Sequence, residues 1–408
     1  MRDRDVTFTG VAGDRLSASL SSPLDGQMRA CALFAHCFTC PKDLKPVKNI
    51  TRALTQAGIA VLRFDFTGLG ESDGDFGDTT FSSNIGDLLA AARYMERELE
   101  GPAILVGHSL GGAAALSAAS SIESCRAVAT IGASFDPAHV TNLFGDRIPD
   151  IEADGVAEVT IAGRAFTVTR EFLRDVQGRR MEETLATLGR PLLLFHSPVD
   201  NVVGIENAAK LYTAARHPKS FISLDDADHL LLDEGDSLYV GNVLAAWADR
   251  YLDPRPEAVS HEPEGDGPVS ARTEAGEGFL TEILARGHAI LADEPVSVGG
   301  SDLGPTPYDL LAAALGACTT MTLQMYAKRK GWPLEEASVR LEHQKLHVKD
   351  QEEACMGREP RLDSLELEVR LEGPLDDEQR ARLMEIADRC PVHRTLSAGV
   401  VIETRAAE

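Results

Sequence analysis

Residues 103–116 read AILVGHSLGGAAAL, a short apolar strand that runs into Gly-His-Ser-Leu-Gly and then into small helix-forming residues. A strand-to-helix turn this tight leaves no room for side chains at its flanks, so we expect Gly107 and Gly111 where a Cβ atom would collide. The hydroxyl of Ser109 then projects from the apex as a candidate nucleophile. A bare G-x-S-x-G pattern is weak, and the strand before it and the helix after it favour this interpretation over an ordinary glycine turn.

The chain alternates apolar strands with helical segments from its start to about residue 252. Short, nearly continuous apolar runs are typical of strands that are buried on both faces of a parallel sheet. These runs are residues 30–36, 59–64, 103–106, 126–132 and 191–195. They predict a mostly parallel sheet with helices on both faces, an α/β architecture. Residues 6–20 predict a lead-in hairpin, and residues 134–186 interrupt the alternation with a second hairpin in an insertion that is a candidate lid over Ser109.

Residues 253–268 read DPRPEAVSHEPEGDGP, which is rich in proline, glutamate and glycine and is typical of an interdomain linker. The linker separates a domain of residues 1–252 from a domain of residues 269–408. In the second domain, residues 362–371 alternate at period two, which suits a sheet with one solvated face. This domain is therefore predicted to be α+β.

Two helices are predicted in the second domain. Residues 307–330 have a proline in the first turn and a glycine just past the end. The other helix begins at Asp376, whose side chain can form a capping box with Gln379, and stops at Pro391. Strands are predicted at residues 279–292 and 338–348 as well as at 362–371.

The formal net charge of −24, with no basic block, argues against nucleic acid and anionic membranes as partners. The first ten residues contain no apolar leader, and we count no apolar stretch that approaches the length of a bilayer span. We therefore expect a cytoplasmic protein without a membrane segment. Seven cysteines are scattered along the chain, unlike the dense framework of a secreted scaffold, so any disulfide is expected to be catalytic rather than structural. They are residues 31, 37, 40, 125, 318, 355 and 390.

A serine hydroxyl needs a base to accept its proton, and the base needs an acid that fixes its tautomer. Asp200 follows the apolar run PLLLF in HSPVD, and His229 follows KSFISL in DDADH. Loops after parallel strands meet at one edge of the sheet, so both are expected beside Ser109. The alternative acids are Asp225, Asp226 and Asp228, but Asp228 is too close to His229 in sequence to reach its ring easily. His217 is interpreted as a solvated loop histidine.

Residues 1–252 resemble the α/β-hydrolase superfamily. The resemblance rests on five segments in the expected order, namely His36-Cys37-Phe38, DFTGLGES at 65–72, GHSLGG, HSPVD and DADH. It implies that the backbone N–H groups of Phe38 and Leu110 form the oxyanion hole, and that a small acyl ester is hydrolysed through an acyl-enzyme on Ser109. The alternative is another reaction on the same fold, such as peroxide chemistry or a dehalogenation, the latter disfavoured because it usually needs an aspartate nucleophile.

Other motifs were weighed and disfavoured. Cys37 and Cys40 form a C-x-x-C pattern, but no second ligand pair for zinc is evident in this domain, and a redox role is the minor interpretation. The segment GLGESDG has Asp73 where a dinucleotide-binding loop needs its third glycine. His343 and His347 lie about 13 Å apart on an extended strand, too far to share an ion. We expect no cofactor and no metal.

Cys318 lies in mid-helix among small side chains, and Cys390 falls on the apolar stripe of the later helix with Leu383, Ile386 and Ala387. Spacing alone favours two buried cysteines that act as small apolar side chains. Residues 269–408, however, resemble the OsmC-like family of organic hydroperoxide reductases, through GPTPYDLLAAALGAC and RCPVH. That resemblance implies a peroxidatic Cys318, a resolving Cys390, an organic hydroperoxide as substrate and a homodimer formed through this domain.

The sequence departs from the better-known members of that family near the helix start. Tyr308 stands where those members have a glutamate, with Asp309 beside it, and Arg286 is the nearest candidate for an arginine that activates the thiol. The alternative is that the OsmC-like unit is a dimerisation or ligand-binding module without redox activity. The fused order itself resembles bifunctional α/β-hydrolase/OsmC proteins.

Overall fold

The computed structural model describes residues 1–23, 28–37, 40–161, 163–178, 180–253, 269–273, 278–347 and 361–406. The chain forms two compact units, Met1–Glu264 and Gly265–Glu408. The division falls inside the segment 253–268, which the sequence analysis interprets as a linker. Each unit is described by itself.

The first unit is built on an eight-stranded sheet whose strand order is β1-β2-β4-β3-β5-β6-β9-β10. The last six strands in this order, β4, β3, β5, β6, β9 and β10, are parallel. The first two, β1 and β2, form an antiparallel hairpin that pairs with β4. This confirms the lead-in hairpin and the mostly parallel sheet. The strands are β1 Arg2–Thr9, β2 Arg15–Ser22, β3 Ala30–Ala35, β4 Ile59–Phe64, β5 Ile104–His108, β6 Ala127–Ile131, β9 Leu192–His196 and β10 Lys219–Ser223.

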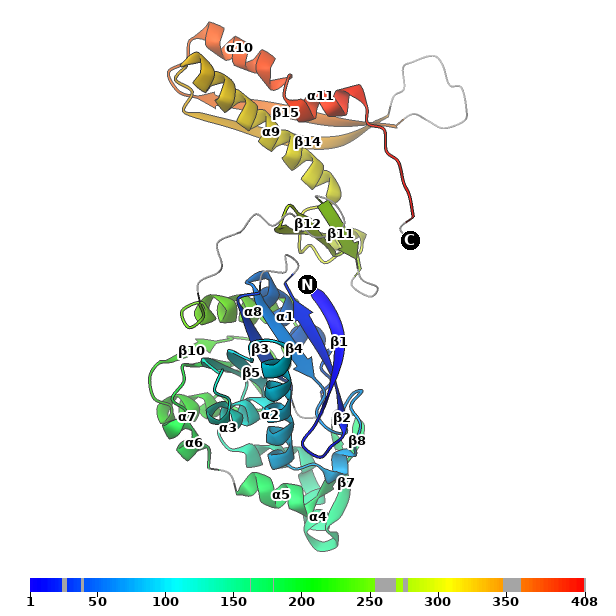
Figure 1. Ribbon diagram of the computed structural model, residues 1–408, viewed down its shortest axis with the longest axis vertical. Coiled ribbons are helices and arrows are strands. Elements are labelled where there is room, and N and C mark those ends of the chain that lie inside the picture. The colour runs from blue at the N-terminus through cyan, green and yellow to red at the C-terminus, as the bar shows by residue number, and fades with distance from the viewer. Residues whose placement is uncertain are drawn as a thin grey trace. The chain divides into compact units, whose positions relative to one another are not determined.

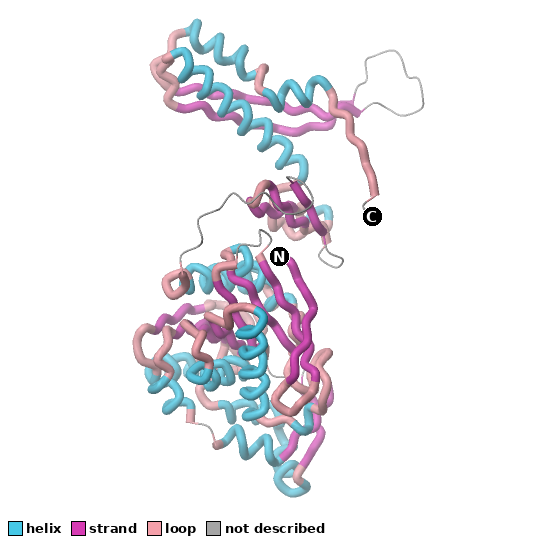
Figure 2. The backbone as a smooth tube through the Cα atoms, viewed as in Figure 1, coloured by secondary structure: helices cyan, strands magenta, loops and turns pink. Residues whose placement is uncertain are grey.

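Both faces of this sheet are buried, as the continuous apolar runs predict. In β3, Leu33 packs into one apolar cluster, and its neighbours Ala32 and Phe34 pack into the other. Helices α1 (Lys45–Gln56) and α8 (Glu234–Ala248) cover the face of Phe34. On the opposite face lie α2 (Phe81–Glu98), α3 (Leu110–Ala118) and α7 (Glu206–Ala214), so that the strands run between two layers of helices (Figures 1 and 2). The predicted α/β class is confirmed.

The insertion between β6 and β9 folds into short elements around the predicted hairpin. They are η3 (Pro137–Arg147), α4 (Ile148–Asp154), β7 (Val156–Ile161), β8 (Arg164–Thr169), α5 (Arg170–Gln177) and α6 (Met181–Thr187). Its apolar side chains, among them Val159, Phe166 and Phe172, join the larger apolar cluster of the unit. The insertion is therefore an integral part of the first core rather than a separate flap.

The second unit is α+β. Its strands are β11 (Val269–Thr273), β12 (Thr281–Ala285) and β13 (His288–Ala292) in one antiparallel sheet, and β14 (Glu336–His347) with β15 (Arg361–Glu372) in another. The single strand predicted for residues 279–292 is wrong, because Arg286 and Gly287 adopt positive φ angles of 50° and 84° and turn the chain into a hairpin. Two consecutive left-handed residues favour the tight turn that fits the twist of paired strands.

Helix α9 spans Pro307–Lys330 as predicted, and α10 spans Asp377–Ala387. The capping box of Asp376 with Gln379 is present, which satisfies backbone N–H groups of the first turn. The helix predicted to run from Asp376 to Pro391 ends earlier, at Ala387, and a further helix that was not predicted follows it. Pro391 is instead the first residue of α11 (Pro391–Ala398), where its missing N–H group costs no helix hydrogen bond.

Helix α9 also corrects the expectation that no segment approaches the length of a bilayer span. By length and composition alone this 24-residue helix is apolar enough to cross a membrane, and 28% of its most apolar window is buried. A single such helix is weak evidence, since helices of soluble proteins meet the same criterion. Its exposed apolar side chains include Leu311, Met321 and Met325.

Candidate active site

Ser109 stands at the turn between β5 and α3 with a strained backbone, φ 56° and ψ −123°. A Cβ atom on Gly107 would lie 2.4 Å from the Gly111 carbonyl oxygen, and one on Gly111 would lie 2.3 Å from that of His36. These separations exclude any side chain at either glycine. The crowding predicted from the sequence is therefore present, and it forces the serine side chain outward from the apex.

Asp200 and His229 are joined directly. The loops after β9 and β10 bring Asp200 Oδ2 to 2.7 Å from His229 Nδ1. Burial alone would raise the pKa of Asp200, but the hydrogen bonds from His229 and from the Val203 and Val202 N–H groups outweigh it and lower the pKa. The carboxylate is thus held in its charged form, which orients His229 with its Nε2 atom free to face another group.

Ser109 and His229 line one cavity of about 230 Å³. Among the described residues no hydrogen bond joins them, so their link in this structure is the shared cavity wall. Leu110 and Ser134 line the same cavity, together with side chains of the insertion. The rest of the wall is mostly apolar and includes Val140, Leu143, Ile161, Val202, Val203 and Leu230. The insertion that the sequence analysis considered as a lid therefore forms part of the wall around the serine.

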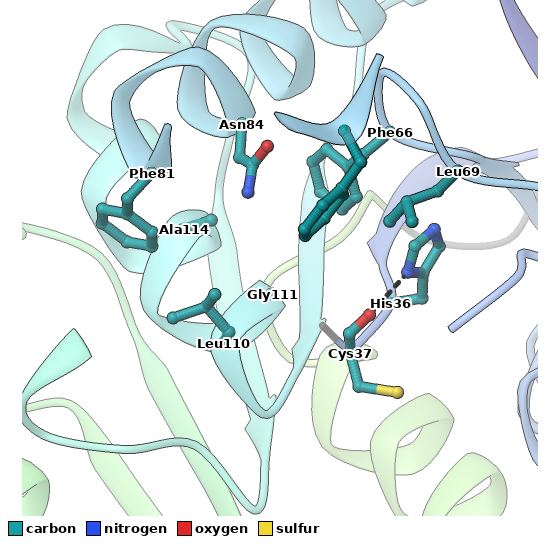
Figure 3. A pocket seen from close by; sticks show the side chains of 10 residues that line it. His36, Cys37, Phe66, Leu69, Phe81, Asn84, Leu110, Gly111 and Ala114 are labelled. Carbon is teal, nitrogen blue, oxygen red and sulfur yellow. Dashed lines mark hydrogen bonds between the residues drawn. The ribbon is translucent and has the colours of Figure 1, made fainter. Parts of the chain in front are cut away.

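A second cavity, of about 10 Å³, lies behind Leu110 and is about large enough for one water molecule. Figure 3 shows its lining, with the His36 ring hydrogen-bonded to the Cys37 carbonyl and the sulfur of Cys37 pointing away from the cavity. Leu110 is the first residue of α3, where helix N–H groups have no acceptor within the helix. The other expected oxyanion donor, Phe38, lies outside the described residues.

The sequence analysis did not single out three buried histidines at strand ends. His36 Nδ1 faces the Cys37 carbonyl at 2.8 Å, His108 Nε2 faces the His229 carbonyl at 2.7 Å, and His196 Nε2 faces the Val203 carbonyl at 2.7 Å. A carbonyl oxygen only accepts, so each of these nitrogens carries the proton and donates it. The three side chains thus hold the loops that carry Cys37, His229 and Asp200. The available signal was an apolar run that ends in histidine, three times in one sheet.

Gly132, which follows β6, lies directly against the Asp200–His229 pair. Its φ is +52°, and a Cβ atom there would lie 3.2 Å from Asp200 Oδ2 and 3.3 Å from the His229 ring. A side chain at this position would be strained and would press on both residues. Nothing in the sequence around Gly132 marks this role.

A buried ion pair joins Lys42 to the DFTGLGES segment. Lys42 Nζ lies 2.9 Å from Asp65 Oδ2 and 2.7 Å from Glu71 Oε2, and the Lys42 N–H group donates to Asp65 Oδ1 at 2.7 Å. Burial would lower the pKa of Lys42, but its bonds to Glu71 and Asp65 outweigh this and raise it. The segment after Cys40 is thereby fixed to the DFTGLGES segment.

The rival residues have other roles. Asp228 accepts hydrogen bonds from the N–H groups of Leu230 and Leu232 at 2.7 and 2.9 Å, and so shapes the loop of His229. His217 is exposed next to Pro218. The part of the chain that the structure describes contains no group of three or more His, Cys, Asp or Glu residues suited to a metal ion.

Cys37 and Cys40 form a disulfide, with their Cα atoms 5.4 Å apart. From the sequence a redox role is only the minor interpretation of this pair, and the missing second ligand pair counts against zinc alone. Both cysteines line the cavity of Ser109. The pairing is therefore part of the candidate site.

In the second unit Cys318 lies on α9 and Cys390 is the N-cap residue of α11, and both are free thiols. Cys390, fully buried, accepts hydrogen bonds at its Sγ atom from the His393 N–H group at 3.2 Å and from Thr319 Oγ1 at 3.4 Å. Thr319 is the residue that follows Cys318, so Cys390 contacts the turn of α9 that carries Cys318. The predicted apolar stripe that ends at Cys390 is confirmed by its burial.

The acid considered for Cys318 has other partners. Asp309 Oδ2 accepts from the Thr306 N–H and hydroxyl groups at 2.9 and 2.8 Å, as the cap of α9. Tyr308 stacks on His343 with ring centroids 4.2 Å apart. Arg286 lies in the β12–β13 turn, and within the described ranges no contact links it to Cys318.

The fold and the serine turn together define a class, the α/β hydrolases, in which a nucleophile stands between a parallel strand and a helix. Comparison with known families agrees. The model of the Alpha/beta hydrolase family matches residues 32–299, which is more than half of the chain, and that of OsmC-like protein matches residues 299–405. The chain belongs to the α/β hydrolase family, and its C-terminal part is OsmC-like.

Similar proteins cover mainly the first unit. The crystal structure of an esterase domain from a Rhodothermus marinus protein is 52% identical, with a TM-score of 0.53, and the match covers 62% of this chain and 99% of that one. Uncharacterized protein YfhR of Salmonella typhimurium is 24% identical over 227 residues, 55% of this chain and 74% of its own. The mouse mitochondrial palmitoyl-protein thioesterase ABHD10 is 28% identical over 188 residues, 44% of this chain and 59% of its own.

We expect His108→Leu to slow the reaction of Ser109 with a fluorophosphonate probe about tenfold, because the buried His229 carbonyl loses its donor. His108→Gln, which keeps an N–H donor near the Nε2 position, is expected to recover most of the rate. Burial and the neighbouring His229 lower the pKa of His108 to about 3, so the imidazole stays neutral and the ratio of variant to wild-type rate should not change between about pH 5 and pH 9. Equal impairment of the Leu and Gln variants would contradict this positioning role.

Proposed function

We propose that the first unit is a serine hydrolase that cleaves carboxylic esters or thioesters of small molecules. The observation that carries the proposal is the Asp200–His229 hydrogen bond of 2.7 Å beside the cavity that Ser109 lines at its strained turn. Esters and thioesters are the class that an activated serine and an oxyanion hole attack. The similarity to an esterase domain and, more distantly, to a palmitoyl-protein thioesterase supports this choice.

In the proposed mechanism His229 Nε2 accepts the proton of Ser109 as the oxygen attacks the acyl carbon. Asp200 stabilises the imidazolium that forms and keeps Nδ1 protonated. The Leu110 N–H group, with that of Phe38 as the resemblance implies, holds the oxyanion. His229 then protonates the leaving alcohol or thiol, and water activated by the same imidazole releases the acid.

The cavity wall indicates the acyl group. Val140, Leu143 and Ile161 come from the insertion, and Val202 and Val203 come from the loop of Asp200, so an apolar acyl chain is favoured over a charged one. Polar contact is available from His139, whose Nδ1 atom lies 2.9 Å from the amide nitrogen of Asn142. We therefore infer a substrate with an apolar acyl part and a polar group near the insertion.

A fluorophosphonate probe should label Ser109 in the folded protein, and peptide mass spectrometry should find the label within residues 103–116. Ser109→Ala should abolish labelling and ester hydrolysis, because no other group supplies the attacking oxygen. Ser117→Ala, on the same helix but bonded to the Ala113 carbonyl, is the matched control and should keep both. A label found outside this peptide would reject the assignment of Ser109.

We further propose that the OsmC-like unit reduces organic hydroperoxides with Cys318 as the attacking thiol and Cys390 as the resolving thiol. The support is the family match over residues 299–405 and the contact of Cys390 with Thr319, next to Cys318. Attack of the Cys318 thiolate on the peroxide would release an alcohol and leave a sulfenic acid. Cys390 would then displace water to form a disulfide, which an external thiol reduces.

We expect Cys318→Ser to abolish consumption of cumene hydroperoxide, and Cys390→Ser to leave one turnover and a trapped sulfenic acid at Cys318. Mass spectrometry of the wild-type protein after one equivalent of peroxide should find the Cys318–Cys390 disulfide. Undiminished consumption by the Cys318→Ser variant would favour the alternative, a dimerisation or ligand-binding module.

We propose a homodimer formed through the second unit, in a cytoplasmic protein. One cluster of six buried apolar residues packs together in the described part of this unit, while Met321 and Met325 on α9 are 64% and 73% exposed. A cluster this small leaves the apolar face of α9 that carries Met321 and Met325 exposed. The resemblance to the OsmC-like family implies that a second copy of the same unit covers it. The four described cysteines that are free thiols, Cys31, Cys125, Cys318 and Cys390, support the location.

Met325→Asp should therefore weaken dimerisation at least about tenfold, since it would place an unpaired charge in an apolar interface. Sedimentation velocity of the full chain at several concentrations measures this change. Tyr239→Asp, which alters a side chain of the first unit that is 49% exposed, is the control and should leave the oligomeric state unchanged. A wild-type protein that sediments as a monomer at all concentrations would overturn the dimer.

A further inference from the structure

The disulfide between Cys37 and Cys40 is distinguished from the other cysteines of the first unit by its position. Cys31 and Cys125 are buried, and burial raises the pKa of each thiol to about 11, so both are unreactive. Cys37 and Cys40 instead line the cavity that Ser109 and His229 share, and Cys40 is only partly buried. A small molecule that enters this cavity meets the disulfide as well as the serine.

The disulfide also lies next to a residue, His36, that contacts the serine turn. The carbonyl of His36 is one of the atoms that exclude a side chain at Gly111, so the chain just before Cys37 packs directly on the turn of Ser109. The Cys37 carbonyl accepts from His36 Nδ1 at 2.8 Å and from the Cys40 N–H group at 3.2 Å. On the far side, Lys42 anchors the chain to Asp65. With both flanks fixed, the bond between the two sulfurs is the covalent constraint on this part of the cavity wall.

We propose that Cys37 and Cys40 form a reversible thiol–disulfide centre that small thiols reduce through the substrate cavity, and that its redox state sets the reactivity of Ser109. The effect on reactivity rests on the proposed serine hydrolase function, while the redox centre itself does not. In a cytoplasmic protein, disulfides are usually transient and take part in catalysis or redox sensing rather than in stabilising the fold. The location of this pair beside a nucleophile fits such a use.

The chemistry balances with two named reactants. A thiolate attacks the more accessible sulfur, that of Cys40, and Cys37 leaves as a thiolate that takes up a proton. A second thiolate then attacks the external sulfur of the mixed disulfide, so that two thiols become one external disulfide while the protein gains two thiols. In the reverse direction one protein thiolate attacks an organic hydroperoxide and releases an alcohol, and the second thiol displaces water from the sulfenic acid.

The expected consequence of reduction is a slower serine. Without the covalent link Cys37 and Cys40 are held only by the hydrogen bonds of their own and flanking residues, and a displacement of about 1 Å near reacting groups can cost up to about 10²-fold in rate. We expect full reduction to lower the rate of ester hydrolysis about tenfold, and a hydroperoxide to restore it.

The test uses the full-length protein and dithiothreitol as the thiol. After incubation at increasing dithiothreitol, iodoacetamide traps free thiols, and mass spectrometry of the peptide that contains Cys37 and Cys40 measures the reduced fraction. Hydrolysis of a p-nitrophenyl ester is followed in the same samples, and cumene hydroperoxide then reoxidises them. The proposal predicts that the reduced fraction and the loss of rate rise together and reverse together.

Variants assign the effect. The Cys37→Ser/Cys40→Ser protein should have the low rate and no response to dithiothreitol. The Cys125→Ala protein and a Cys318→Ser/Cys390→Ser protein should both keep the response, because their changes lie outside the pair. A response that disappears in the Cys318→Ser/Cys390→Ser protein would overturn the assignment to Cys37 and Cys40.

Two further results would overturn the proposal. The first is that Cys37 and Cys40 stay unalkylated in the folded protein at excess dithiothreitol. The second is that the pair is reduced completely and reversibly while the rate of ester hydrolysis changes by less than about twofold, which is below what a displaced cavity wall should cause. Absence of ester hydrolysis and of fluorophosphonate labelling in both redox states would instead reject the serine hydrolase function. In that case the alkylation of Cys37 and Cys40 still shows whether the pair is a reversible redox centre.

Discussion

The first unit depends on the close approach of three backbone segments at the serine turn. The end of β3, the end of β5 and the start of α3 meet so tightly that the glycines at 107 and 111 have no room for a Cβ atom. This approach holds Ser109 at a positive φ angle that a larger framework must stabilise, and strain of this kind costs of order 1–3 kcal/mol. The parallel sheet supplies that framework because both of its faces are buried.

Around this turn buried polar side chains form hydrogen bonds that hold the backbone of the neighbouring loops in place. His108 and His196 donate to the loops of His229 and Asp200, and the carboxylate of Asp200 accepts from two N–H groups of its own loop. Since a buried carbonyl or carboxylate without a partner is costly, each of these bonds restricts its loop to one position. The two side chains that we propose as acid and base are therefore held in a fixed orientation, as efficient proton transfer requires.

Much of the fold was predictable because its signals are local. Apolar runs located the parallel strands, the alternation of residues 159–168 located the hairpin in the insertion, and a capping box located the start of α10. The predictions failed where one local signal permits two structures. Residues 279–292 are mostly apolar on both sides of Arg286, and the left-handed turn at Arg286 and Gly287 makes them a hairpin. We interpret Pro391 from the sequence as a helix stop, but α10 ends before it, at Ala387, and Pro391 begins α11.

The sequence alone determined the α/β class, the serine at its turn, and the order of the acid and base along the chain, because each is encoded by neighbouring residues. The tertiary structure decided which of several aspartates meets His229, that Gly132 must lack a side chain, that Lys42 and Asp65 form a buried pair, and that the disulfide faces the cavity of Ser109. These features join residues far apart in the chain, and periodicity carries no information about which distant loops a sheet edge brings together.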